Sequence, residues 1–148
     1  MSEPVAKKEA EVALNEPEVA KFDLNTFSDL TPLQETGTEV PITHPGTGEP
    51  LGIKMVVVGP DSKRQKAATS AIIAERAELR IRKISAARLE EEANRIAAAS
   101  IIAWSGVVEN GKEIEYSPSV ALGLLVRYPF IREQISSYAG DRANFLKK

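Results

Sequence analysis

The stretch from Asp61 to Trp104 contains neither proline nor glycine, and it constrains the fold more than any other part of the chain. Proline breaks helices and glycine weakens them, so their absence from a run rich in Ala, Arg, Glu and Lys favours a helix. Pro60 stands just before the run, at a position that suits the first turn of a helix. The sequence therefore predicts one long helix over residues 61–104, with a length of about 60–65 Å.

Apolar residues recur along this predicted helix at spacings of four, four and three. Such spacings place side chains on one face of a helix, and that face is a candidate surface for binding a partner. The residues of this stripe are Ile73, Ala77, Ile81 and Ile84. Acidic and basic residues alternate around it, which fits three interpretations: a solvated face with pairs such as Glu78 and Arg82, a partner-docking helix, or a nucleic-acid-binding helix. Because the basic residues are interleaved with acids, the third interpretation is the weakest.

The sequence on either side of the predicted helix has the signals of small β-structures and short helices. Residues 38–58 predict a β-hairpin, with Pro41 at an edge position and a turn rich in Gly and Pro. After the helix, Gly106 suits a left-handed cap, and Asn110-Gly111 predicts a second, shorter hairpin. Ser117-Pro118 predicts the start of a C-terminal helical cap. The predicted fold is α+β and predominantly α-helical, in a single domain over residues 37–148.

Residues 1–36 differ from the rest in composition, and they predict an extended or flexible arm. Acidic residues outnumber basic ones in its first part, where large apolar residues are sparse. Phe22 and Phe27 follow as candidate anchors, which would lie either on the chain's own domain or on another subunit.

The composition excludes several kinds of site. The chain has no cysteine and one histidine, which rules out disulfides, thiolate catalysis and His-rich metal sites. His44 lies in a predicted turn with no obvious nucleophile to serve, and Glu90, Glu91 and Glu92 point in different directions on a helix and predict a solvated face. The sequence therefore predicts no catalytic residue, no cofactor, no metal and no enzymatic activity. It has no secretion signal or long apolar run, so we expect it to act inside the cell that makes it.

Residues 37–148 resemble the tail assembly chaperones of long-tailed bacteriophages. The segments that carry the resemblance are His44-Pro-Gly-Thr-Gly-Glu-Pro-Leu51 with the strand that follows, Trp104-Ser-Gly106, Gly111 leading to Tyr116-Ser-Pro118, Tyr128-Pro-Phe-Ile-Arg-Glu-Gln134, and Asp141-Arg-Ala-Asn-Phe-Leu146. They occur in the expected order, and the N-terminal arm lies outside the match.

This resemblance implies a non-enzymatic role in the host cytoplasm during phage assembly. Such chaperones bind the tape-measure protein, a long helical chain rich in apolar residues, and keep it soluble until the tail tube polymerises around it. The apolar stripe and the arm are the surfaces we expect to bind this or another virion protein, and homo-oligomers are plausible. Membrane binding is not expected, and nucleic-acid binding is unlikely. The alternative is a structural virion component, such as a minor capsid, cement or connector protein, whose arm contacts neighbouring subunits.

Overall fold

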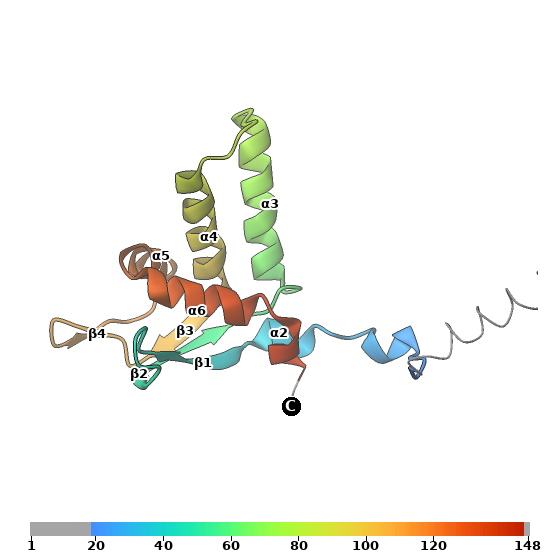
Figure 1. Cartoon of the computed structure of the whole chain (residues 1–148), viewed down its shortest axis with the longest axis horizontal. Coiled ribbons are helices and arrows are strands. Elements are labelled where there is room, and N and C mark those ends of the chain that lie inside the picture. The colour runs from blue at the N-terminus through green and yellow to red at the C-terminus, as the bar shows by residue number, and fades with distance from the viewer. Residues whose placement is uncertain (1–18, 147–148) are drawn as a thin grey trace, which may run out of the picture.

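The computed structural model describes residues 19–146, and its body is a small antiparallel sheet covered by helices (Figure 1). Strands β1 (Thr38–Thr43), β2 (Pro50–Val57) and β3 (Ile101–Ser105) form the sheet in that order. A second, two-stranded ribbon pairs β4 (Val108–Glu109) with β5 (Lys112–Glu113). The helices are α2 (Pro32–Thr36), α3 (Lys63–Glu78), α4 (Ala86–Ser100), α5 (Pro118–Arg127) and α6 (Pro129–Ala139), with 3-10 turns η1 (Leu24–Phe27) and η2 (Arg142–Phe145). The predicted α+β, predominantly helical class is confirmed.

Both predicted hairpins are present. β1 pairs with β2 in antiparallel register from Thr38 opposite Val57. No other strand of residues 19–146 lies beside β1, so Pro41 lies on an edge strand as predicted. The tight turn between β4 and β5 has Asn110 at φ +54° and Gly111 at φ +75°. These are the left-handed conformations that a two-residue hairpin loop requires.

The single long helix predicted over residues 61–104 is wrong. The chain folds back on itself instead, and α3 and α4 form a helical hairpin that projects from the body (Figure 1). α3 ends at Glu78, and Arg80 adopts a left-handed φ of +54°. Ser85 then starts α4, because its side chain accepts a hydrogen bond from the Arg88 amide at 3.1 Å. A non-glycine residue in the left-handed region gives little signal in a sequence.

The end of the predicted helix is also different, because residues 101–105 form strand β3. Ile101 lies opposite Val57 and Trp104 lies opposite Met55 in β2. Ile101 and Ile102 are β-branched and favour a strand, and the exposed edge of β2 supplies the hydrogen bonds that the helix would otherwise provide. Gly106 has the left-handed φ (+77°) that the sequence suggested, but it follows a strand and does not cap a helix.

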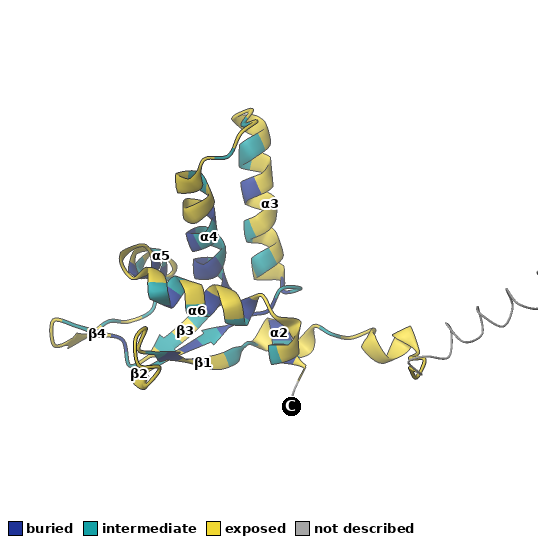
Figure 2. Cartoon of the chain, viewed as in Figure 1, coloured by how far each residue is buried: buried dark blue, intermediate teal, exposed yellow. Residues whose placement is uncertain are grey.

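The core lies between the sheet and the helices that cover it. Residues with the smallest exposure, such as Ile42, Met55, Ile101, Leu125 and Ile135, come from both the sheet and helices α5 and α6. Figure 2 shows buried residues on α4 and α6 near the sheet, whereas the outer part of the hairpin is mostly exposed or intermediate. α3 contributes only Ile72 to the buried residues. The outer half of the hairpin therefore depends little on the core.

The predicted arm does not extend to residue 36, because its last part packs into the body. Leu33 contacts the core and Gln34 is fully buried. The Gln34 side chain accepts a hydrogen bond from the Asp61 amide at 2.6 Å and donates one to the Leu30 carbonyl at 2.6 Å. The bond from Asp61 joins α2 to the segment that leads into α3. Residues 1–18 of the predicted arm lie outside the described residues.

Candidate partner-binding surfaces

The predicted apolar stripe is divided between a helix and the loop that follows it. Ile73 is 59% exposed and Ala77 is exposed on α3, but Ile81 and Ile84 are half-buried in the connection between the helices. The residue of α3 that packs inward is Ile72, one position earlier than the stripe. The structure therefore places Ile73 and Ala77 on an outward surface, but it does not continue them into a single helical face with the other two residues.

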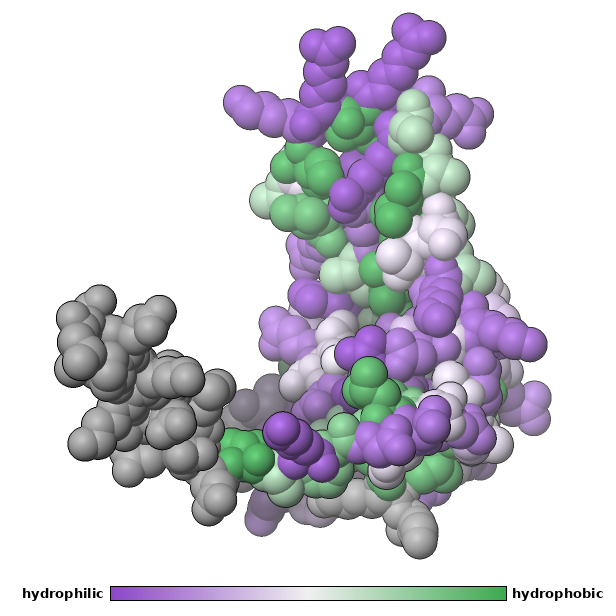
Figure 3. Space-filling model, turned by 90° about the vertical axis from the view of Figure 1, so that its right-hand side faces the viewer, coloured by the Kyte–Doolittle hydropathy of each residue, from purple (hydrophilic) through white to green (hydrophobic). Residues whose placement is uncertain are grey.

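Leu79 is another exposed apolar residue of the hairpin, and the sequence did not single it out. It is 59% exposed at the end of α3, one position beyond the last helical residue. Figure 3 shows hydrophobic patches on the projecting hairpin below a cap of hydrophilic side chains. Single surface leucines and isoleucines are common, whereas several exposed apolar residues on one projection make it a candidate surface for binding a partner.

Salt bridges between the two helices hold the hairpin closed. The Glu92 side chain is only 4% exposed and accepts hydrogen bonds from Arg76 and, at 2.9 Å, from Arg88 Nε. Glu75 accepts hydrogen bonds from Arg88 at 2.7 Å and from Arg95 at 3.1 and 3.2 Å. These five residues, Glu75, Arg76, Arg88, Glu92 and Arg95, form the interhelical charge cluster.

Two predictions about charged residues are wrong, because they assumed one helix where the chain forms two. The sequence predicted a solvated face for Glu90, Glu91 and Glu92, but Glu92 is buried in the charge cluster and only the other two are exposed. The pair between Glu78 and Arg82 does not form, because the helix ends before Arg82. The fold-back supplies partners from a second helix, which a single-helix interpretation could not anticipate.

Acid should weaken the hairpin, because both carboxyl groups of the charge cluster have lowered pKa values. Hydrogen bonds from Arg76 and then Arg88 lower the pKa of Glu92 to about 2, and those from Arg95 and Arg88 lower the pKa of Glu75. Their stabilising effect is complete above the ordinary pKa of 4.5 and is lost as the pH falls towards 2. We expect thermal melts followed by circular dichroism to show Glu92→Gln as less stable than wild type at pH 6, with the gap closing towards pH 2. A gap that stays constant over this range would contradict the assignment.

The aromatic residues of the arm are exposed. Phe22 is 71% exposed and Phe27 is 42% exposed, and their ring centroids lie 6.2 Å apart. Leu24, between them, is also exposed. The chain's own domain, one of the two positions predicted for these anchors, therefore does not bury the two phenylalanines.

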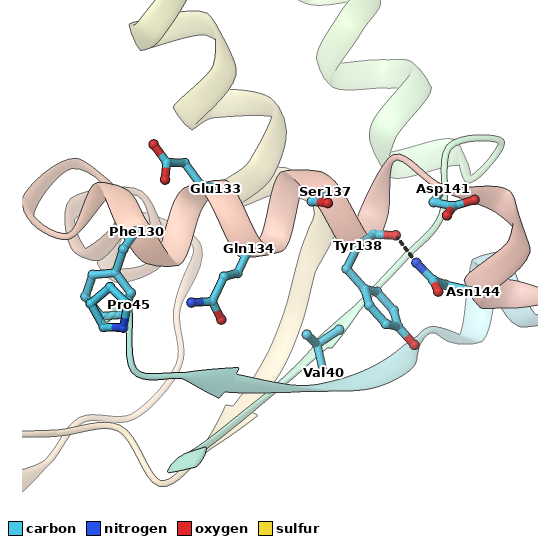
Figure 4. A pocket seen from close by; sticks show the side chains of 9 residues that line it. All are labelled: Val40, Pro45, Phe130, Glu133, Gln134, Ser137, Tyr138, Asp141 and Asn144. Carbon is cyan, nitrogen blue, oxygen red and sulfur yellow. Dashed lines mark hydrogen bonds between the residues drawn. The ribbon is translucent and has the colours of Figure 1, made fainter. Parts of the chain in front are cut away.

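A groove between β1 and α6 is a further surface that the sequence did not indicate (Figure 4). It has a volume of about 470 Å³, with Pro45 and Phe130 at one end and Tyr138 and Asn144 at the other. Gln134 points across it to the edge strand, where it accepts a hydrogen bond from the Thr43 amide and donates one to the Thr43 carbonyl, both at 2.9 Å. The side-chain amide occupies the place that a neighbouring strand would take.

His44 stabilises its own turn. His44 is exposed in its turn as predicted, and its Nδ1 accepts hydrogen bonds from the amides of Gly46 and Thr47 at 2.9 and 3.1 Å. Among residues 19–146, no group of three or more His, Cys, Asp or Glu side chains could hold a metal ion. No helix in the same range is both long and apolar enough to cross a membrane.

Comparison with known proteins identifies a family. The model of the family described as YdaY prophage protein matches residues 61–148, which is more than half of the chain and includes the helical hairpin, β3 and both C-terminal helices. No curated protein matches. No solved structure matches either. The phage origin that the resemblance implied is confirmed, whereas the assignment to tail assembly chaperones stays a prediction. The chain belongs to the YdaY prophage protein family.

Proposed function

We propose that this chain is a non-enzymatic phage assembly protein, a tail assembly chaperone that binds the tape-measure protein. The observation that carries the proposal is the projecting hairpin with Ile73 and Leu79 exposed on it, in a protein of a prophage family. An exposed apolar helix aggregates unless another surface covers it. A helical hairpin with outward apolar side chains can lie against such a helix and bury its apolar positions.

The distribution of charge on the hairpin supports the same role. Charged side chains surround the apolar residues, and the inner ones are paired within the charge cluster. A complex that covers its apolar residues and leaves charges outside stays soluble. The exposed Phe22 and Phe27 provide a second contact that would lengthen the covered stretch of the client. In this role the protein acts in the host cytoplasm before tail assembly is complete.

Co-expression with the tape-measure protein of the same phage tests the proposal. We expect the double change Ile73→Ser and Leu79→Ser to lower the soluble fraction of the tape-measure protein by about tenfold. The reason is that the complex would lose two apolar side chains that are exposed in the free chain and buried in the contact. The matched control is Val108→Ser with Leu51→Ser, which removes exposed apolar side chains away from the hairpin. Equal solubility with both double variants would refute the proposed surface.

Mass spectrometry of purified particles separates this role from a structural one. We expect the protein in infected-cell lysate, bound to the tape-measure protein, and not in mature particles. Its abundant presence in particles would instead favour a minor capsid, cement or connector protein that uses Phe22 and Phe27 to contact neighbouring subunits.

A further inference from the structure

The end of the helical hairpin is a compact basic surface. Arg80, Arg82 and Lys83 lie within four consecutive residues of the connection between α3 and α4, and all three are exposed. None of them forms a salt bridge with any residue between 19 and 146. Leu79 and the half-buried Ile81 stand beside them. We call residues 79–84 the basic tip; it combines cationic groups with apolar contact area.

A second groove, between α4 and α5, has the opposite charge. Its volume is about 490 Å³, and Leu122 and Val126 of α5 provide apolar lining. Glu90 and Glu91 contribute carboxylates from α4, and both are exposed. We call this the acidic groove. An apolar lining with carboxylates beside it suits a basic side chain, whose methylene stem packs while its charged end is paired.

The polar groups of the acidic groove leave room for an added donor. Asn94, which is 7% exposed, lines the groove, and its Oδ1 atom accepts no hydrogen bond from any described residue. Arg95 also lines the groove and Arg132 lies beside it, but both guanidinium groups face other carboxylates or keep their distance. Arg95 is bound to Glu75 through both terminal nitrogens, and Arg132 approaches Glu90 only to 3.9 Å. Glu91 has no ion-pair partner within residues 19–146.

We propose that the basic tip of one copy of this chain docks in the acidic groove of a second copy. The charge complementarity supports this occupant: the tip presents donors and positive charge, and the groove presents acceptors and negative charge. Within one chain the tip is the far end of the hairpin, whereas the groove lies along the side of α4, so the contact joins separate copies (Figure 1). Because the two surfaces differ, the contact either forms reciprocally in a dimer or continues into a ring or chain.

Charge reversal on the purified full chain tests this proposal without the tape-measure protein, so its outcome is independent of the proposed chaperone role. We expect wild-type protein to self-associate in sedimentation equilibrium, more weakly as salt rises. The tip variant Arg82→Glu with Lys83→Glu and the groove variant Glu90→Lys with Glu91→Lys should each weaken association by tenfold or more. An equimolar mixture of the two should associate again, because the reversed tip then complements the reversed groove.

Sedimentation equilibrium also provides the control and the outcomes that would overturn the proposal. The change Glu113→Lys with Glu115→Lys makes the same difference in net charge as the groove variant, at exposed positions outside the groove, and it should leave association unchanged. Circular dichroism checks that each variant is folded. A monomeric wild type at a concentration of about 1 mM, or variants that do not associate when mixed, would overturn the proposal. If the tip variant and the groove variant each still associate on their own, the contact lies on another surface and the proposal is overturned.

Discussion

Replacing Gly106 with alanine should destabilise the protein strongly, because the added methyl group would collide with backbone atoms. Gly106 has φ +77°, and a Cβ atom there would lie 2.0 Å from the Gly52 carbonyl oxygen. That oxygen belongs to the backbone of β2, at the bulge where its pairing with β1 shifts between Ile42 and Thr43, so the clash can be relieved only by moving main chain. The left-handed conformation alone costs an alanine about 1–2 kcal/mol, and the displaced backbone raises the expected loss in unfolding free energy to about 3–5 kcal/mol.

Urea unfolding of Gly106→Ala, compared with that of Gly48→Ala, separates the cost of the left-handed conformation from the cost of the clash with Gly52. Gly48 has the same φ of +77°, but a Cβ atom there meets nothing within 4 Å. We therefore expect Gly48→Ala to lose only about 1–2 kcal/mol, which is the cost of the conformation itself. If the two variants unfold at the same urea concentration, the close approach of Gly106 to Gly52 does not exist in solution.

Removing the Glu92 carboxylate should open the helical hairpin while the body stays folded. In Glu92→Ala, Arg76 loses its partner and Arg88 keeps only Glu75. α3 has one buried residue, Ile72, so apolar packing adds little, and of the charge cluster only the bonds of Glu75 with Arg88 and Arg95 remain between the helices. We expect hydrogen exchange in residues 70–78 to become about tenfold faster or more, because a charge-assisted network is lost from an element of low local stability.

Glu91→Ala is the matched control for this experiment. It removes a glutamate from the adjacent position of the same helix, but Glu91 forms no salt bridge with the described residues. Exchange in α3 should then stay at the wild-type rate, and exchange in β2 should be unaffected in both variants. Equal acceleration by the two changes would mean that helix propensity, and not the charge cluster, governs the opening.

Local signals predicted the elements that local chemistry decides. Asn110-Gly111 marked a tight hairpin and Ser117-Pro118 marked the start of α5, because these residues favour their conformations whatever surrounds them. Pro41 indicated an edge strand because proline cannot donate a hydrogen bond to a second neighbour.

The helical hairpin could not be predicted in this way, because its causes are tertiary. Nothing in the composition of residues 61–104 forbids a continuous helix, and the turn at Arg80 uses a conformation that arginine adopts rarely. The fold-back is stabilised by contacts between α3 and α4, such as that of Arg76 with Glu92, which a helical periodicity within one segment cannot reveal. The predicted binding stripe was wrong for the same reason, because it assumed that one helix runs through both Ile73 and Ile84.

Side chains that bond to the backbone of the outer strands also limit the addition of further strands to the sheet. A bare strand edge recruits further strands, from another chain or from an unfolded copy, and extends into aggregates. Here Gln134 holds the amide and carbonyl of Thr43 on β1, while Tyr116 donates a hydrogen bond to the Ile101 carbonyl on β3 at 2.7 Å. One residue at the end of each outer strand therefore bonds to a side chain of its own molecule. These bonds leave fewer free backbone groups at the sheet edges with which a strand of another chain could pair.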